Sequence, residues 1–339
     1  MKYGYWLPVF GGWLRNVEDE HMQADWNYVK KLAIRSEQIG FDVSLIAELN
    51  LNDIKGIDAP SLDAWSTTAA LAAVTEKIEL MVAVRPTFHN PALLAKAAAN
   101  IDHISNGRVS LNVVSSWWKD EAEKYGVHFE QHDDRYARTE EWLTVLDNVW
   151  KQDHFSFKGK YYEVNDNILQ PKPISKPRPF LYAGGESDKA KDLISSTCDG
   201  YVMHGDDPVT IGKRINDIKQ RRAAKNLPPM KFGVAAYSII RNSDAEIKHE
   251  LERITNVKAG TAGYDNYQQW LAGTQLENTV SLYDYSVSNR GLRTGLIGSP
   301  QQVKDTVAQF EAVGVDFFLL QCSPQLEEME RFAASIINN

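Results

Sequence analysis

The 339-residue sequence predicts an α/β protein folded as a single (β/α)8 TIM barrel with inserted loops. Short apolar runs alternate with longer amphipathic segments from end to end, which is typical of parallel β/α units. Eight such units occur, and they fit a closed barrel of about 250 residues that tolerates insertions better than they fit an open sheet. No repeat, low-complexity tract or linker interrupts them, so we interpret residues 1–339 as one domain.

The predicted units follow one another in order from the N-terminus. A strand is expected where apolar residues form a short continuous run, and a helix where they recur with helical spacing. The expected strands are 3–8, 43–46, 78–84, 109–114, 180–183, 200–203, 232–240 and 317–320. The expected helices include 25–38, about 61–74, 91–104, 134–150 and a last helix that begins near residue 324.

Two segments break this alternation and are interpreted as insertions. The first, about residues 152–178, is rich in lysine, proline and aromatic residues. The second, about residues 250–292, has weak periodicity and many glycine, serine, asparagine and tyrosine residues. A loop of that length inside a compact domain is more often an active-site lid than a plain connection. We therefore expect 250–292 to form a lid.

Composition excludes several classes of protein. The net charge of −8 argues against a general nucleic-acid binder, which needs a basic face. No window approaches about 18 uninterrupted apolar residues, and the N-terminus lacks the pattern of a signal peptide. The two cysteines, Cys198 and Cys322, do not suggest a disulfide framework. We expect a soluble, cytoplasmic protein.

One stretch, "RPFLYAGGESDKAKDLIS" at 178–195, raises the question of a bound anion. An apolar run meets Gly184-Gly185, and a helical segment begins directly after Ser187. A helix N-terminus offers unpaired N–H groups, and glycines let the backbone approach an anion closely, so a phosphate cradle is one interpretation. The alternative is a plain turn with Ser187 as the helix N-cap. The acidic Glu186, directly after the two glycines, counts against the binding of a phosphate there.

Other site types find little support in the sequence. A P-loop, a G-x-G-x-x-G after the first strand and a G-x-S-x-G nucleophile elbow are all absent. His128 and His132 are four residues apart but lack an H-E-x-x-H motif, so we expect no metal site. The predicted strand ends are instead crowded with tryptophan, serine and glycine. Such a mouth suggests a flat, phosphorylated cofactor that carries the chemistry itself.

Four segments, "NGRVSLNVVSSWWKDEAEKYG", "HDDRYARTEEWL", "YAGGESDKAKDL" and "LRTGLIGSPQQV", carry a resemblance to a known family. In these segments the chain resembles the bacterial luciferase-like flavin monooxygenases, most closely the alkanesulfonate, dimethyl sulfone and pyrimidine monooxygenase subgroups. The resemblance implies a barrel that binds FMN as FMNH2, supplied by a separate NAD(P)H-dependent FMN reductase, and a homo-oligomer, either a dimer or a tetramer. It also implies positions for the flavin. By resemblance, its contacts would be Glu48, Leu49, Asn112, Glu121, Arg135, Tyr136, Gly184, Gly185 and Ser187.

The departures from the alkanesulfonate subgroup concern the substrate. That subgroup has a cysteine where this chain has Ser61, and an arginine and a histidine where it has Ala235 and Tyr237. It ends the eighth strand with Tyr-Pro-His, where this chain has 323–325, Ser-Pro-Gln. Losing the arginine–histidine pair removes the obvious counter-charge for a sulfonate. We expect a neutral substrate, or an anionic one held by the lid arginines, Arg290 and Arg293.

The resemblance implies that reduced FMN reacts with O2 to give a peroxyflavin, which oxygenates a small sulfone or alkanesulfonate and leads to C–S cleavage. Water must be kept away, and Trp6, Trp13, Trp65 and Trp117 are the expected shields. Tyr237 is either a hydrogen-bond donor or acid, or a structural residue. The alternatives are cleavage of an amide or heterocycle, as in the pyrimidine enzymes, a flavin-binding barrel without turnover, and a deazaflavin-dependent reductase. The candidate catalytic residues are Trp117, Tyr237, Arg290 and Arg293.

Overall fold

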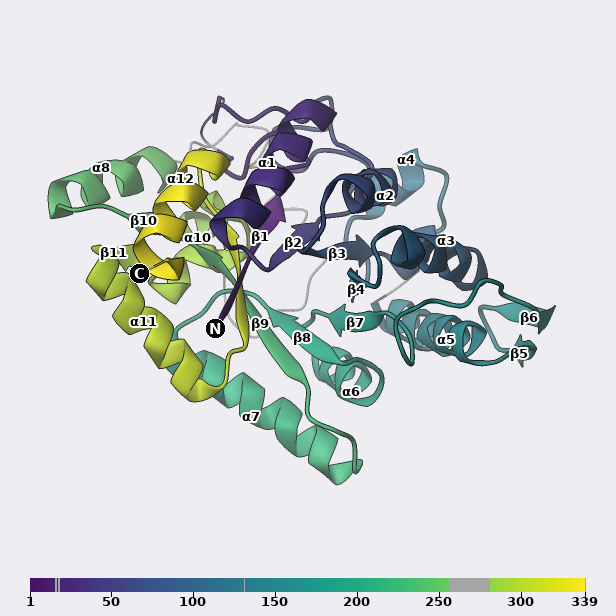
Figure 1. The fold of residues 1–339 in the computed structure, drawn as a ribbon. Coiled ribbons are helices and arrows are strands. Elements are labelled where there is room, and N and C mark those ends of the chain that lie inside the picture. Colours follow the sequence, from purple (N-terminus) through teal and green to yellow (C-terminus); the bar gives the residue numbers. More distant parts are fainter. Residues whose placement is uncertain (16, 18, 131, 256–280, 339) are drawn as a thin grey trace.

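A computed structural model describes residues 1–338 apart from 16, 18, 131 and 256–280. Its centre is a closed barrel of eight parallel strands in the order β1-β12-β9-β8-β7-β4-β3-β2 (Figure 1). All eight predicted strands occur, seven of them with at most small shifts at their ends and the one predicted at 232–240 divided into two. The strands are β1 Lys2–Leu7, β2 Val43–Ile46, β3 Glu79–Val84, β4 Val109–Val113, β7 Phe180–Ala183, β8 Gly200–Met203, β9 Lys231–Tyr237 and β12 Phe317–Gln321.

Helices surround the barrel, and their starts are fixed by short polar side chains. Asp25, Asp63, Asn90 and Asp207 each accept a hydrogen bond from a backbone N–H of the first helical turn. The helix predicted from about residue 61 therefore begins at Ala64, directly after its cap. The main helices are α1 Trp26–Ile39, α2 Ala64–Val74, α3 Pro91–Ile104, α4 Lys119–Lys124, α5 His132–Lys151, α6 Asp188–Thr197, α7 Pro208–Ala224, α8 Asp244–Thr255, α11 Pro300–Val313 and α12 Gln325–Phe332.

The inserted segments contain structure that the sequence did not indicate. Within 152–178, β5 Phe155–Lys158 and β6 Glu163–Asn167 form an antiparallel hairpin beside α5 (Figure 1). The strand predicted at 232–240 is in fact two strands. After β9, the short β10 Ile239–Ile240 leaves the barrel and pairs with β11 Ile297–Gly298.

The predicted lid lies partly outside the described residues, because it includes 256–280. Its described end contains the short helix α10 Leu282–Ser286 and the helical turns η2 Ser288–Thr294. This end of the segment packs against β9.

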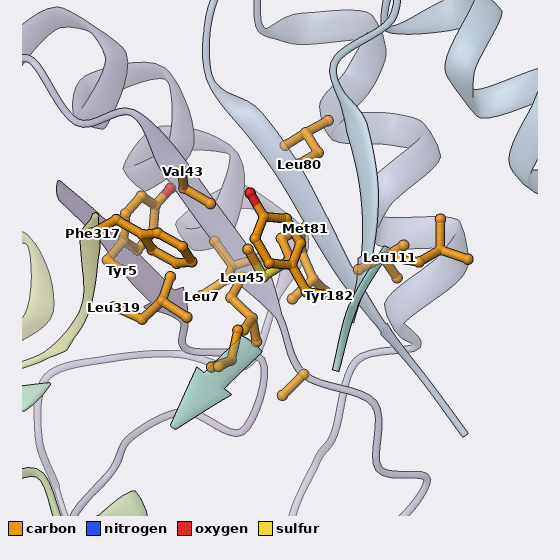
Figure 2. Packing of buried hydrophobic residues seen from close by; sticks show 14 of the residues in the cluster. Tyr5, Leu7, Val43, Leu45, Leu80, Met81, Leu111, Tyr182, Phe317 and Leu319 are labelled. Atoms are coloured by element: carbon orange, nitrogen blue, oxygen red, sulfur yellow. The ribbon is translucent and has the colours of Figure 1, made fainter. Parts of the chain in front are cut away.

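The core fills the barrel and the layer between strands and helices. Figure 2 shows part of it, with side chains from β1, β2, β3, β4, β7 and β12 packed together. Tyr5, Leu7, Leu45 and Leu80 are completely buried there. A packed interior of this kind makes a rigid frame that fixes where each strand ends. Of the helices that the structure describes, none is both long and apolar enough to cross a membrane.

Candidate functional site

A cavity of about 280 Å³ lies where the barrel strands end. Its wall consists of the last residues of the strands, the loops that follow them and the described end of the predicted lid. This position is the one that the barrel fold predicts for an active site. Of the predicted flavin contacts, seven line the cavity: Glu48, Leu49, Asn112, Arg135, Tyr136, Gly184 and Gly185.

Aromatic side chains form much of the cavity wall. Trp13 packs edge-on against Trp6 and Phe10, with ring centroids 6.3 and 6.2 Å apart. The Trp13 indole N–H donates a 2.8 Å hydrogen bond to the Oε1 atom of Gln325, which fixes the ring. Trp117 also lines the cavity and stacks on the buried Trp118, with the two ring planes 2° from parallel. These rings provide a flat, apolar surface.

Trp65 is the exception among the four expected shields. It is not part of the cavity wall, and its indole N–H donates a hydrogen bond to Glu48 at 3.1 Å.

Several buried polar atoms of the wall have no hydrogen-bond partner among the described residues. They are the Trp6 indole nitrogen, Asn112 Oδ1, Ser116 Oγ and both amide atoms of Gln321. Buried polar groups in native proteins are almost always paired, so unpaired ones at a cavity point to a missing ligand. Together these atoms offer N–H donors and carbonyl acceptors, which is what a flat heterocycle with alternating carbonyl and N–H groups requires. The residues therefore fit a flavin ring.

A buried charge network supports one side of the cavity. Arg85 forms ion pairs with Glu48 and with Glu121, and its guanidinium lies 4.1 Å above the Phe88 ring. Glu48 also accepts hydrogen bonds from the backbone N–H of Arg85, at 2.8 Å, and lies 2.6 Å from His89 Nε2. With every acceptor of Glu48 engaged, its carboxylate is held in a single orientation.

Glu121, another predicted flavin contact, forms an ion pair with Arg85. It is completely buried, and it is not part of the cavity wall. Its Oε1 atom accepts hydrogen bonds from Arg85, at 3.0 Å, and from the backbone N–H of Asn50, at 2.5 Å. Its carboxylate therefore positions Arg85, which does line the cavity.

The Gly184-Gly185 turn lies between β7 and α6 and forms another part of the wall. Gly185 has a φ of 156°, and a Cβ atom at this position would lie 2.6 Å from that of Ala190, so only glycine fits. Ser187 is the N-cap of α6 and accepts a 3.2 Å hydrogen bond from the N–H of Ala190. Ser187 is thus the helix N-cap, as one interpretation of the sequence predicted. Ser187 is not in the wall, and a phosphate at this turn stays a prediction.

Arg135 and Tyr136 reach the cavity from α5, close to this turn. The Tyr136 hydroxyl would lie 3.4 Å from a Cβ atom at Gly185, and burial raises the pKa of Tyr136. Arg135 lines the cavity, with its guanidinium 4.6 Å from the Phe129 ring centroid and one hydrogen bond to the Glu130 carbonyl. Within the described part of the chain, it is the one cavity arginine without a carboxylate at ion-pair distance. A buried cation of this kind fits a phosphate.

Glu186 and Arg290 form a second buried ion pair in the wall. Only 7% of Glu186 and 2% of Arg290 are exposed. His204 Nδ1 lies 3.3 Å from the Glu186 carboxylate, and burial, followed by the charge of Arg214, lowers the pKa of His204 to about 4. Burial and the nearby Arg293 lower the pKa of Arg290 to about 10, so its guanidinium stays charged at neutral pH. Glu186 is therefore paired with the Arg290 cation, a partner that the sequence argument against a phosphate did not foresee.

Two candidate catalytic residues lie outside the cavity wall. Tyr237 is 1% exposed and packs with Leu14 and Ile239 in a separate apolar cluster, where burial raises its pKa well above 10. Its place outside the wall favours the structural alternative over the role of hydrogen-bond donor or acid. Arg293 binds Asp284, at 2.7 Å between Nη2 and Oδ2, and so positions an acidic residue of the wall.

Sequence reasoning missed some residues of the wall. Arg15 and Asp53 form a buried pair at 3.0 Å, yet they come from irregular loops that carry no motif. Gln321 had a usable signal, because it is the polar last residue of the otherwise apolar β12 segment "FFLLQ". No cluster of three or more potential metal ligands occurs in the described ranges.

Comparison with known proteins relates this chain to a family. Residues 1–316 match the family model described as luciferase-like monooxygenase. The FMNH(2)-dependent dimethylsulfone monooxygenase of Pseudomonas putida is 34% identical over 99% of this chain and 94% of the relative. The protein of the same name from Pseudomonas fluorescens (strain Pf0-1) is 32% identical over 99% and 93%. The crystal structure of a long-chain alkane monooxygenase (LadA) superposes with a TM-score of 0.85 at 19% identity, over 100% of this chain and 90% of that one.

Proposed function

Because this chain belongs to the family of luciferase-like monooxygenases, we propose that it uses reduced FMN and O2 to oxygenate a small, neutral organosulfur compound such as dimethyl sulfone. One observation carries the proposal. The aromatic cavity presents amide and indole groups without hydrogen-bond partners in the described structure, beside the Gly184-Gly185 turn. The charge of Arg290 in its wall is neutralised by the Glu186 carboxylate. A flat cofactor and an uncharged substrate suit such a cavity.

The residues present would hold FMN in two places. Asn112, Gln321 and Trp6 would meet the polar edge of the ring system, because their buried polar atoms lack other partners in the described structure. Arg135 and the Gly184-Gly185 turn at the start of α6 would hold the phosphate. When bound in its reduced form, the flavin supplies the electrons that activate O2.

The chain itself would exclude water from the cavity and fix the loops around it. Phe10, Trp13 and Trp117 exclude water from the cavity, which protects a reactive oxygen species from loss before transfer. The Ser61 hydroxyl donates a 2.8 Å hydrogen bond to the Leu49 carbonyl and so fixes the loop after β2. Among the described residues of the wall no cysteine and no Ser-His pair occurs, in keeping with oxygen transfer that needs no protein nucleophile.

Uncharged side chains at and beside the wall support a neutral substrate. Ala235, which replaces an arginine of the alkanesulfonate subgroup, lines the cavity without a charge. Gln325 stands where that subgroup has the histidine of its Tyr-Pro-His segment. It is buried and neutral, and it accepts a hydrogen bond from Trp13. A buried anion without a partner costs several kcal/mol in proteins, roughly as much as binding a small ligand yields. A sulfone avoids that cost.

Dependence on FMNH2, which the names of the two Pseudomonas relatives state, implies a separate flavin reductase. The identity of that reductase, the dimer or tetramer and the cytoplasmic location stay predictions. The pyrimidine-type reaction on an amide or heterocycle has no specific support in the described wall.

Formaldehyde release tests the proposed function. Dimethyl sulfone, O2 and the two hydrogens of reduced flavin balance to methanesulfinic acid, formaldehyde and water, with one C–S bond broken. With photoreduced FMN as the sole reductant, we expect formaldehyde in proportion to dimethyl sulfone consumed, and none under anaerobic conditions. If the flavin is oxidised and no formaldehyde forms, the chain binds flavin but does not oxygenate dimethyl sulfone. Activity with a reduced deazaflavin alone would identify a reductase instead.

A further inference from the structure

The backbone around Arg290, which pairs with Glu186 in the cavity wall, is held in a constrained conformation. Asn289 and Arg290 both have left-handed backbone conformations, with φ values of 59° and 57°. Such conformations cost non-glycine residues about 1–3 kcal/mol and persist only where the surroundings enforce them. Here the Asn289 carbonyl accepts a 2.9 Å hydrogen bond from the N–H of Gly205, and any Cβ atom at Gly205 would lie 2.5 Å from the Arg290 carbonyl oxygen. The backbone of Arg290 is thus held close to Gly205, just after the end of β8.

Arg290 keeps hydrogen-bonding capacity for a ligand. Its Nη2 atom binds Glu186, whereas its Nε and Nη1 atoms are buried and lack a partner anywhere in the described structure. These two atoms lie on opposite edges of the planar guanidinium, so each can donate to a separate ligand oxygen. Those oxygens can belong to a neutral sulfone or to a sulfonate anion.

The surrounding charges decide between these two ligands. Glu186 cancels the charge of Arg290, and His204 beside it is neutral at the pH of an ordinary assay. The other acidic residues of the wall are occupied elsewhere: Glu48 by Arg85, Asp53 by Arg15 and Asp284 by Arg293. A sulfonate at Arg290 would therefore meet a cation that is already paired, with a carboxylate next to it.

We propose that Glu186 is a specificity-determining residue, which makes Arg290 a donor for uncharged sulfone oxygens and rejects sulfonate anions. The proposal rests on the proposed function, since it concerns which organosulfur substrates that site accepts. Glu186 acts through charge and not through the flavin phosphate, although it directly follows the Gly184-Gly185 turn.

Removing the carboxylate charge while keeping its shape is the direct test. In E186Q, the methanesulfonate-to-dimethyl sulfone ratio of kcat/KM should rise at least tenfold, because Arg290 becomes an unpaired buried cation. Titration calorimetry with methanesulfonate should show at least tenfold tighter binding, a readout that needs no turnover. D206N is the matched control, because Asp206 pairs with Arg214 at 2.9 Å but is not part of the wall. The ratio in D206N should stay within twofold of wild type.

Several results would overturn the proposal. An unchanged ratio in folded E186Q would do so, as would a tenfold change in FMN affinity, which would place the pair at the cofactor. E186S provides a second variant, and failure of both variants to fold would make the pair purely structural. If the wild-type chain turned over neither compound, the proposed function itself would fail, which is distinguishable from an unchanged ratio in an active enzyme.

Discussion

Replacing Arg85 by alanine is expected to lower the free energy of unfolding by about 3–5 kcal/mol, because it leaves Glu48 and Glu121 buried without their shared cation. Glu121 is completely buried and 9% of Glu48 is exposed, so water cannot solvate the two carboxylates in place of the guanidinium. Urea unfolding followed by tryptophan fluorescence measures the change.

The matched control for Arg85 is Arg35→Ala. Arg35 and Glu330 also form an arginine–glutamate pair, at 2.7 Å, but about 44% and 45% of their side chains are exposed. Exposed pairs typically contribute about 0–1 kcal/mol, so this variant should unfold almost as wild type does. Equal losses in the two variants would contradict the view that burial makes the Arg85 network costly to break.

Arg135→Ala should weaken FMN binding about 10- to 150-fold, which corresponds to the roughly 1.5–3 kcal/mol of a hydrogen bond to a charged group. The reason is that Arg135 is the cavity arginine whose charge no carboxylate cancels within the described structure, so it is available to a phosphate. Quenching of FMN fluorescence gives the dissociation constant.

Arg138→Ala serves as the control for Arg135. Arg138 lies one turn further along α5, pairs with Glu130 and is not part of the wall. FMN affinity should be unchanged in this variant. If riboflavin, which lacks the phosphate, loses as much affinity as FMN does in Arg135→Ala, the arginine does not bind the phosphate.

The barrel could be predicted from the sequence because its strands are buried on both faces. Continuous apolar runs such as "ELMVAV" in β3 and "FFLLQ" in β12 leave little doubt about the element type. The β5–β6 hairpin was not predicted, because its second strand, "EVNDN", is polar and mostly exposed and lacks the apolar alternation that marks a strand.

The site was harder to predict wherever a role depends on a distant partner. Glu186 looked unfavourable for anion binding, but the cation that it meets lies 104 residues away in the sequence. Glu121 was expected to contact the flavin; it is paired with Arg85 and is not part of the cavity wall, and its contact with the flavin stays a prediction.

Strand ends posed a related difficulty. Ala235 and Tyr237 are two residues apart on β9 and should share one face. The strand ends at Tyr237, and this side chain joins the neighbouring apolar cluster while Ala235 lines the cavity. Local patterns do not contain such information.

The most direct test of the account is the substrate preference of the wild-type chain. The measurement is kcat/KM for dimethyl sulfone, methanesulfonate and octanesulfonate under an identical supply of reduced FMN and O2. Neutralisation of Arg290 by Glu186 predicts at least a tenfold preference for dimethyl sulfone, equivalent to about 1.4 kcal/mol of differential transition-state binding. An equal or higher kcat/KM for either sulfonate would contradict it.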